Sequence, residues 1–333
     1  MTVVRRNSVQ RASLAAIAGR ARECGAGSVG TSTESDSRPR RGRTCGRKSE
    51  APNSAGRSMT ASGPAEHHPV IRIPPIKVGM STAAVYPEGT AAAFATAVDL
   101  GYDGLEVMVQ TEALSQDADL LANLIDEYQI PVLSVHSPCL LVTARVWSTD
   151  PLVKLARSVD MAERLGAQTV VVHPPFLWQR AASTIFAPSI AELQDRTSVR
   201  IAVENMFPVK VRGAVVNSYR PHWNPVPAGH RWFTLDLSHT ATSGTDALEL
   251  FEVMGSRLAH LHLADGSGSG KDEHLVPGRG GQPCSEILEL LARNGYHGSV
   301  VVEISTRGVD RDQREVDLAE ALSFARLHLA AAV

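Results

Sequence analysis

Acidic and histidine side chains recur at the ends of short apolar segments between residues 76 and 305. In chain order they are Glu106, His136, His173, Glu204, Asp236, His239, His262, Asp265, Asp272, His274 and Glu303. Such side chains cost several kcal/mol to bury unless they are paired or bind a metal. Lysine and arginine are rare at the same positions, where we find only Lys271 and Arg279. A divalent cation would supply the missing positive charge.

The donor set bears on the identity of this metal. Nitrogen and oxygen donors mixed in this way favour zinc. An oxygen-dominated subset, Glu204, Asp236 and Glu303, would instead suit manganese or magnesium. Structural zinc sites are usually closed cages that include cysteine, and no cysteine belongs to this set. We therefore expect an open, catalytic centre.

Eight apolar segments rich in β-forming residues predict eight strands. They span residues 76–82, 104–109, 132–137, 169–174, 200–206, 233–239, 258–265 and 298–305. Their apolar runs are nearly continuous, which is typical of parallel strands covered on both faces. Amphipathic helical patterns lie between them, and Gly101 and Gly166 stand where helices should end. The sequence predicts an α/β fold, a (β/α)8 TIM barrel over residues 76–333.

Active sites of such barrels form at the carboxyl ends of the strands, where the acidic and histidine residues fall. The long connection 207–232 is predicted to form a lid or a substrate wall. The Gly-rich stretch 274–281 carries Arg279 and has two interpretations: a phosphate-binding loop, or a tight turn that needs glycine.

Residues 1–75 differ in composition from the rest of the chain. Residues 1–76 contain 13 Lys+Arg and 5 Asp+Glu, whereas residues 77–333 contain 20 and 30. Few bulky apolar residues occur in the first part, so we predict a disordered, basic tail rich in Arg, Ser and Gly. It could serve as a transit peptide or a nucleic-acid arm, or be a dispensable extension with initiation at Met59 or Met80. No signal peptide or membrane-spanning run is evident, and a cytoplasmic protein is expected.

The ordered motifs VHSP, VVHPP, VENM, LDLSH, HLHLAD, DEHLVPGRG and VVEIS resemble the xylose isomerase-like TIM barrel superfamily. That superfamily groups sugar and sugar-phosphate isomerases and epimerases with the AP endonuclease family 2 (endonuclease IV-type) nucleases. The resemblance covers about residues 76–330. It implies a divalent metal and an active site at the strand ends, and is specific for the superfamily rather than for one activity.

The isomerase and epimerase branch implies one metal held by Glu204, Asp236, His262 and Glu303. Glu204 and Glu303 would then act as base and acid in proton transfer next to a carbonyl. We expect His136, His173 and His239 to contact substrate hydroxyls, and Arg279 to contact a phosphate. The expected partner is a small carbohydrate, and the sequence predicts neither its identity nor the oligomeric state.

The nuclease branch is the alternative, a zinc phosphodiesterase acting on abasic DNA. It implies three zinc ions, with His136, His173, His239, Asp272 and His274 added to the four ligands above. The residues around them depart from the nuclease pattern: this chain has Leu237-Ser238 where that branch has Thr-Cys, and Glu273 where it has Arg. An acidic residue beside a phosphate groove would repel DNA. We therefore favour the isomerase or epimerase and consider nucleic-acid binding the weaker prediction.

Overall fold

The computed structural model describes residues 76–331 apart from 212–213. The predicted tail, residues 1–75, lies outside the described residues. Its disorder and its separation from the barrel therefore stay predictions.

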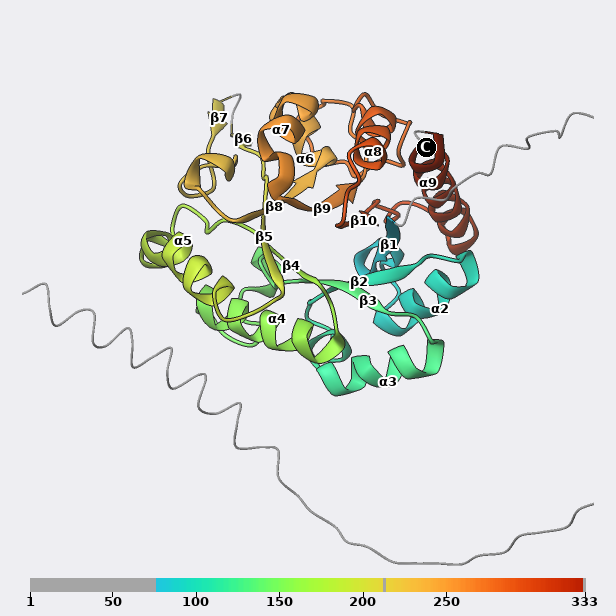
Figure 1. The fold of residues 1–333 in the computed structure, drawn as a ribbon, viewed down its shortest axis with the longest axis horizontal. Helices are drawn as coiled ribbons and strands as arrows, with labels where there is room; N and C mark the ends of the chain where they lie inside the picture. The colour runs from blue at the N-terminus through green and yellow to red at the C-terminus, as the bar shows by residue number, and fades with distance from the viewer. Residues whose placement is uncertain (1–75, 212–213, 332–333) are drawn as a thin grey trace, which may run out of the picture. The chain divides into compact units, whose positions relative to one another are not determined.

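Eight parallel strands close into a barrel, as the sequence predicts (Figure 1). They are β1 (Lys77–Ser81), β2 (Gly104–Met108), β3 (Val132–His136), β4 (Thr169–Val172), β5 (Arg200–Glu204), β8 (Trp232–Asp236), β9 (Leu258–Leu263) and β10 (Ser299–Val302). Their order around the barrel is β1-β10-β9-β8-β5-β4-β3-β2, and β1 pairs with both β2 and β10. The strands end one to three residues earlier than predicted, so several of the acidic and histidine residues lie just beyond a strand.

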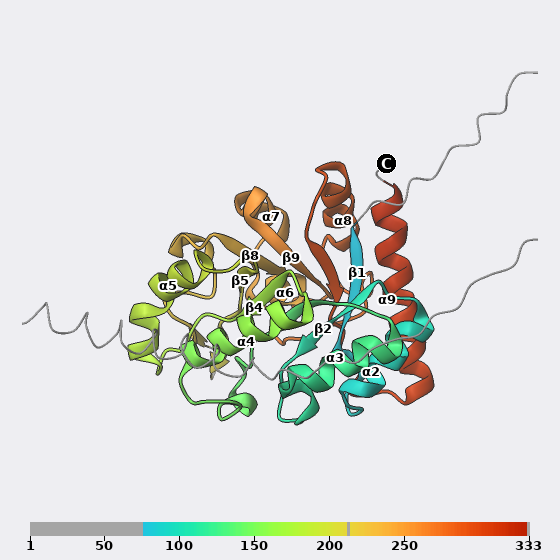
Figure 2. The same cartoon turned by 60° about the horizontal axis from the view of Figure 1, so that its bottom comes forward.

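Helices follow the strands and cover the outside of the barrel (Figures 1 and 2). They are α2 (Thr90–Leu100), α3 (Ala118–Tyr128), α4 (Pro151–Leu165), α5 (Arg180–Gln194), α6 (Leu237–Ser243), α7 (Ala247–Met254), α8 (Cys284–Arg293) and α9 (Arg311–Ala331). Short 3-10 helices occur at Thr82–Val85, Leu114–Gln116, Leu141–Thr143, Val226–Ala228 and Gly255–Arg257. The last helix, α9, lies beside β1 and α8 (Figure 2).

Local sequence signals explain where these helices begin and end. The Asp150 side chain accepts a hydrogen bond from the Leu152 amide, and Pro151 occupies the first helical position of α4. Gly101 and Gly166 adopt the left-handed conformation that ends α2 and α4. These breaks return the chain to the barrel at the amino end of the next strand.

Apolar side chains fill the space between strands and helices. The strand residues Leu105, Val170, Ile201 and Leu261 are fully buried, and so is Leu318 on α9. Burying an aliphatic side chain of this size contributes about 1.5–3 kcal/mol. The core is continuous around the barrel and leaves the carboxyl ends of the strands to polar side chains.

The connection between β5 and β8 contains more regular structure than predicted. It carries a short antiparallel sheet, β6 (Val209–Val211) and β7 (Ala214–Val216). The segment after β7 is anchored to the loop after β4, because Leu177 donates to the Ser218 carbonyl and Arg220 donates to the Pro175 carbonyl. This part of the connection forms a fixed wall, one of its two predicted roles.

Within the part of the chain that the structure describes, no helix is both long enough and apolar enough to cross a membrane.

Candidate functional site

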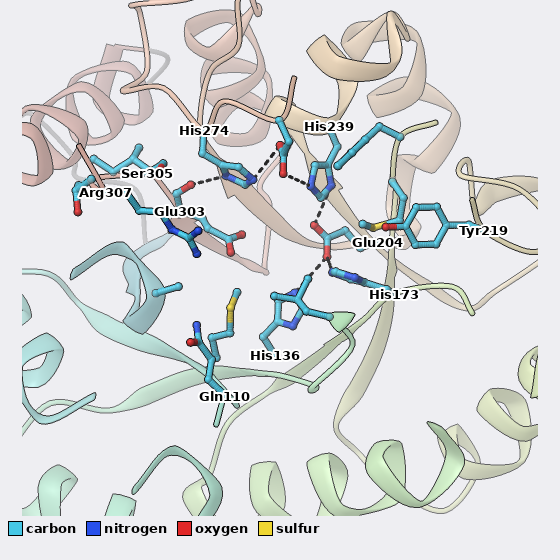
Figure 3. Close-up of a pocket in the computed structure, with 18 residues that line it drawn as sticks. Gln110, His136, His173, Glu204, Tyr219, His239, His274, Glu303, Ser305 and Arg307 are labelled. Atoms are coloured by element: carbon cyan, nitrogen blue, oxygen red, sulfur yellow. Dashed lines mark hydrogen bonds and ion pairs between the residues drawn. The ribbon is translucent and has the colours of Figure 1, made fainter. Parts of the chain in front are cut away.

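A cavity of about 380 Å³ opens at the carboxyl ends of the strands (Figure 3). Its volume falls in the range of about 300–1,000 Å³ that is typical of small-molecule sites. Nearly all the barrel strands contribute to its wall, with Met108 and His136 ending their strands and His173 and Glu303 following theirs. This is the end of a TIM barrel at which active sites form.

Four side chains converge beside the cavity: Glu204 and Glu303 line it, and the fully buried Asp236 and His262 contact them. Each offers one ligand atom, and these four atoms all lie within 4.8 Å of one another. His262 Nδ1 lies 2.8 Å from Glu303 Oε2, 3.1 Å from Glu204 Oε1 and 3.5 Å from Asp236 Oδ2. We call these four residues the central group, and they are the four predicted from the family resemblance.

The central group suits a divalent cation. Glu204 and Asp236 are at most 1% exposed; Asp236 Oδ2 receives no hydrogen bond, and the nitrogen atoms nearest to Glu204 Oε2 belong to His173 and His136. A buried carboxylate oxygen without a hydrogen bond is costly, and a metal ion would satisfy it. The donors are three carboxylates and one imidazole, a set that binds zinc or manganese.

A second group adjoins the central group through Glu204. His136, His173 and Glu204 are buried and also offer ligand atoms within 4.8 Å of one another. Glu204 Oε2 lies 3.0 Å from His173 Nε2 and 3.4 Å from His136 Nε2. Both histidines line the cavity and therefore stand where a ligand of the central group would contact them.

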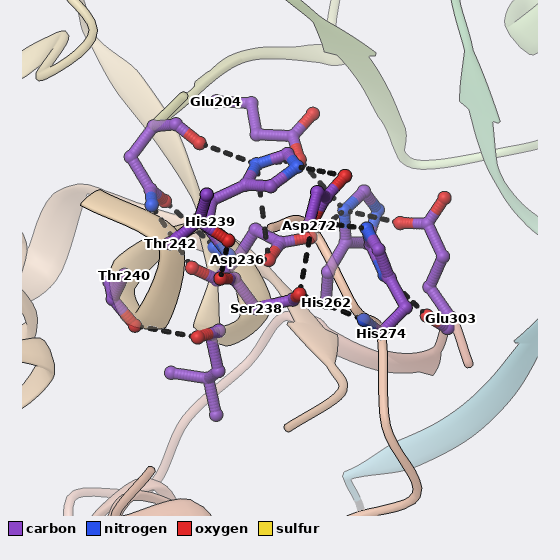
Figure 4. Close-up of polar contacts among 12 residues, drawn as sticks. Glu204, Asp236, Ser238, His239, Thr240, Thr242, His262, Asp272, His274 and Glu303 are labelled. Carbon is purple, nitrogen blue, oxygen red and sulfur yellow. Dashed lines mark hydrogen bonds and ion pairs between the residues drawn. The ribbon is translucent and has the colours of Figure 1, made fainter. Parts of the chain in front are cut away.

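A third group lies on the other side of Asp236. It comprises Asp236, His239 and His274, whose ligand atoms also lie within 4.8 Å of one another. The Asp272 carboxylate lies between the two histidines, 3.6 Å from His239 Nε2 and 3.1 Å from His274 Nε2 (Figure 4). Ser238 on α6 positions this group, because its hydroxyl donates to Asp272 and accepts from the His274 amide. The nine residues predicted for a three-metal site thus form one contiguous cluster.

Backbone carbonyls orient three of these histidines. The Nδ1 atoms of His136, His239 and His274 lie 3.0, 2.8 and 2.7 Å from the carbonyl oxygens of residues 137, 205 and 303. A carbonyl oxygen can only accept a hydrogen bond, so Nδ1 of each histidine carries a proton. The Nε2 atom of each ring faces a carboxylate of the site. Outer hydrogen bonds of this kind are typical of metal-binding histidines.

A further buried cluster, which the ligand prediction missed in part, lies below the central group. Glu106 is fully buried; it accepts from Ser134 Oγ at 2.7 Å and lies 3.0 Å from His262 Nε2. His260, also fully buried, lies 2.9 Å from its other oxygen and 3.0 Å from Ser299 Oγ. The sequence singled out Glu106 but not His260, although the alternating pattern HLH in β9 places both histidines on the same face.

The charges of the site shift its pKa values. Burial would lower the pKa of His262, but the surrounding carboxylates, with Glu303 foremost, raise it well above its usual value. Burial also opposes protonation of His274, yet Asp272 raises its pKa to about 10. Conversely, burial would raise the pKa of Glu204, but the charge of His262 holds it well below its usual range. Without a cation, the raised pKa values favour the protonated forms of His262 and His274, which would offset part of the carboxylate charge.

Arg279 does not reach the cavity. Its guanidinium pairs with Asp317 and Glu320 on α9. The Gly-rich loop around it is also committed elsewhere, because the amides of Gly278 and Gly280 donate to the buried Asp265 carboxylate. A phosphate has neither this arginine nor these amides to bind, which leaves the tight turn as the interpretation that the structure favours.

Tyr219 and Arg307 are among the cavity residues that the sequence analysis did not single out. Tyr219 comes from the wall after β7, and Arg307 follows β10 by five residues (Figure 3). Tyr219 could not be placed because the wall's path depends on contacts with the β4 loop. Arg307 carried a readable signal, a basic residue shortly after a strand end, but it fell beyond the last predicted strand.

Comparison with known proteins agrees with the barrel fold. The family model described as xylose isomerase-like TIM barrel matches residues 94–328. Protein Rv0498 of Mycobacterium tuberculosis is 50% identical over 276 residues, covering 77% of this chain and 99% of its own length. Fructoselysine 3-epimerase of Shigella flexneri is 22% identical over 253 residues, covering 69% and 91%.

Among solved structures, the IolI protein crystallised with a zinc atom superposes with a TM-score of 0.60. It is 18% identical, and the match covers 78% of this chain and 99% of that chain. At this identity the likeness concerns the fold. The extent of the family match, together with the closed barrel and its site, shows that the chain belongs to the xylose isomerase-like TIM barrel family.

Proposed function

We propose that this protein is a divalent-metal-dependent isomerase or epimerase of a small carbohydrate, acting by proton transfer next to a carbonyl. The observation that carries the proposal is the convergence of Glu204, Asp236, His262 and Glu303 beside a cavity of ligand size, which Glu204 and Glu303 line. The names of its relatives support it, since one is a sugar epimerase and another holds zinc.

The central group would hold the cation, most readily zinc, with manganese or magnesium as alternatives. Bound there, the cation would polarise the substrate carbonyl and offset the negative charge that develops on its oxygen. This chemistry requires a cavity open to the substrate. Glu303 is the member of the central group most accessible from the cavity. Its side chain is 13% exposed, while those of the other three members are at most 1% exposed.

Glu204 and Glu303 would move the proton. Glu204 ends β5 and Glu303 directly follows β10, two strands separated in the barrel by β8 and β9, so that the two side chains would approach a bound substrate from different directions. One carboxylate takes the proton from the carbon next to the carbonyl, and the other, already protonated, returns one to the product. His136, His173 and His239 line the same cavity and would hold substrate hydroxyls.

Incubation with ketoses in heavy water tests this function. The zinc- or manganese-loaded protein should introduce deuterium at the carbon next to the carbonyl of its substrate, detected by mass spectrometry and proton NMR. Absence of exchange across a panel of neutral and anionic ketoses, under conditions in which the metal is bound, would refute the proposal.

A zinc phosphodiesterase remains the second candidate, because the three groups place all nine residues that such a site implies in one cluster. Glu273 and the excess of acidic residues over 77–333 speak against a DNA groove. Metal analysis of the purified protein separates the two functions. One exchangeable ion per chain supports the isomerase, whereas three zinc ions with cleavage of an abasic oligonucleotide would support the nuclease.

A further inference from the structure

We propose that Arg307 forms an anion-binding subsite at the rim of the cavity, and that the substrate is an anionic carbohydrate whose carboxylate or phosphate binds there. This inference rests on the proposed function for the carbohydrate and on the geometry of Arg307 for the anion. Nothing in the comparisons assigns a role to this arginine.

The turn that carries Arg307 is fixed on both sides. The Ser305 amide donates to the His274 carbonyl at 2.8 Å. The Thr306 hydroxyl is buried, donates to the Ala84 carbonyl at 2.7 Å and accepts from Arg314 Nε at 3.1 Å. The backbone of Arg307 is thereby held relative to β1, α9 and the third group. A side chain on such a turn is presented to the cavity in a defined direction.

The guanidinium of Arg307 stacks on an aromatic ring rather than on an acid. Its central carbon lies 4.8 Å from the centre of the Tyr86 ring, a cation–π contact that restrains it without neutralising it. Among the residues described by the structure, no carboxylate lies within ion-pair distance of it. Arg279, in the loop after β9, and Arg314, seven residues after Arg307, are by contrast both paired with acids.

Figure 3 shows the Arg307 guanidinium turned into the cavity beside Glu303, with Tyr219 and His173 on the far side. It is the one arginine or lysine among the described residues that line this cavity. A planar guanidinium has donors spaced to bind a carboxylate or phosphate through two hydrogen bonds. A carbohydrate bound with its carbonyl over the central group can therefore extend an anionic end toward Arg307.

The other place where an anion was expected is already occupied by the protein itself. The Gly278, Gly280 and Gln282 amides donate to the Asp265 carboxylate at 2.9 Å, so this Gly-rich loop has bound an internal anion. The loop thus closes around Asp265, and Arg307 is left as the cation that faces the substrate.

Three probes with the same carbon chain test the subsite: D-fructose, D-fructose 6-phosphate and D-fructuronate. Their binding to the zinc-loaded full chain is measured by isothermal titration calorimetry, which requires no turnover. The variants are Arg307→Gln and Arg307→Lys, with Arg279→Gln as the matched control because it removes an exposed arginine outside the cavity. Circular dichroism and metal content verify that each variant is folded and loaded.

We expect the wild-type protein to bind at least one anionic probe about 10- to 100-fold more tightly than fructose, the range of one charged hydrogen-bonded pair. Arg307→Gln should abolish that preference while changing fructose binding less than about twofold. Arg307→Lys should retain part of the preference, since lysine keeps the positive charge but lacks the paired donors of the guanidinium. Arg279→Gln should retain the whole preference. Comparing the phosphate with the carboxylate identifies which anion the subsite takes.

Three results would overturn the subsite. The first is that the wild-type protein shows no preference for either anionic probe, which includes no binding at all. The second is a preference that survives in Arg307→Gln, which would place the anion on the metal, and the third is loss of the preference in Arg279→Gln alone. Its failure is separable from failure of the proposed function. If deuterium exchange occurs with neutral ketoses only, the proposed function stands and the subsite does not. If anions bind through Arg307 but no ketose exchanges deuterium, the subsite stands and the proposed function does not.

Discussion

The imidazole of His262 is held between two carboxylates, Glu106 below it and Glu303 above it. Its Nε2 lies 3.0 Å from Glu106 Oε1, and its Nδ1 lies 2.8 Å from Glu303 Oε2. Because Glu106 is fully buried and ionised, it accepts a hydrogen bond from Nε2, so that the neutral, metal-binding form of His262 would present its Nδ1 lone pair to the central group. One residue on β2 thus sets which nitrogen of a β9 histidine is available to a cation.

Glu106→Gln should weaken metal binding without removing any predicted ligand. The amide can turn its NH2 group toward His262, which would move the ring proton to Nδ1 and block coordination. Loss of an outer hydrogen bond of this kind typically costs about 10- to 100-fold in metal affinity. Competition with a chromophoric zinc chelator measures the change.

Ser134→Ala is the control for this substitution. It removes the hydrogen bond to the other oxygen of Glu106 and leaves the contact with His262 in place. Its zinc affinity should stay within a few fold of the wild-type value. Nitrogen-15 NMR of the zinc-loaded proteins should show His262 bound to zinc through Nδ1 and protonated at Nε2 in the wild type, and this signature should be lost in Glu106→Gln. Equal affinity of the wild type and Glu106→Gln would contradict the orienting role.

Glu303→Gln separates a catalytic centre from a structural one. If Glu303 transfers the proton, the substitution should reduce deuterium exchange by about 100-fold or more, the usual contribution of a general acid or base. The protein should stay folded, because Glu303 borders the cavity and is the most exposed member of the central group. Exchange rate and melting temperature are measured in parallel, with metal content confirmed.

The exposed Glu286 on α8 provides a control for charge removal, since Glu286→Gln should change neither exchange nor stability. A Glu303→Gln protein that unfolds, or that keeps full exchange, would show that the centre braces the fold or that another group moves the proton.

Asp265 illustrates both the reach and the limit of the sequence analysis. The eight strands and the convergence of the central group could be predicted, because parallel strands in a closed barrel bring their carboxyl ends together. Asp265 stood in the same pattern as His262, yet its carboxylate accepts four backbone amides of its own loop. Position at a strand end does not reveal whether a side chain faces the cavity or the backbone that follows.

Arg279 and Arg307 differ for a related reason. Arg279 lies in a Gly-rich motif that suggested phosphate binding, but its partner acids belong to α9, about 40 residues later in the chain. Arg307 lies in the cavity because Thr306 is tied to the segment after β1, more than 200 residues earlier. Contacts at such separation depend on how the helices pack, and local patterns do not encode them.

Asp265→Asn should destabilise the loop that carries the third group. An asparagine oxygen accepts fewer hydrogen bonds than the carboxylate, and its NH2 group would face amide donors. Since hydrogen bonds to charged groups contribute about 1.5–3 kcal/mol each, we expect the free energy of unfolding to fall by about 2–4 kcal/mol. Urea denaturation measures this loss, and hydrogen exchange should rise first in residues 266–282.

Ser267→Ala is the comparison within the same loop, because Ser267 contacts only the exposed Glu273 there. It should cost less than about 0.5 kcal/mol. If Asp265→Asn were as stable as Ser267→Ala, the carboxylate would not be the element that organises the loop.

The stability of the metal-free protein should depend on pH more steeply than that of the metal-loaded protein. His262 and His274 have pKa values raised above the usual 6.5, that of His274 to about 10. A group whose pKa rises on folding stabilises the folded state below its unfolded pKa and loses this effect as the pH rises toward its folded pKa. The metal-free protein should therefore become less stable between pH 6.5 and 9. His173 and His260, whose pKa values are lowered, act below pH 6.5 and do not alter this window.

Metal binding removes most of this trend because zinc competes with the protons on these histidines. As the pH rises from 6.5 to 9 the competition weakens, zinc affinity increases, and the loaded protein gains stability over the metal-free one. Thermal unfolding of both forms across this range gives the two slopes, and calorimetry in buffers of different ionisation enthalpy counts the protons released. The buried Glu204 should stay ionised throughout, since its pKa is held low. Parallel slopes with no proton release would mean that zinc binds away from His262 and His274, and the central group would then lose its place as the metal site.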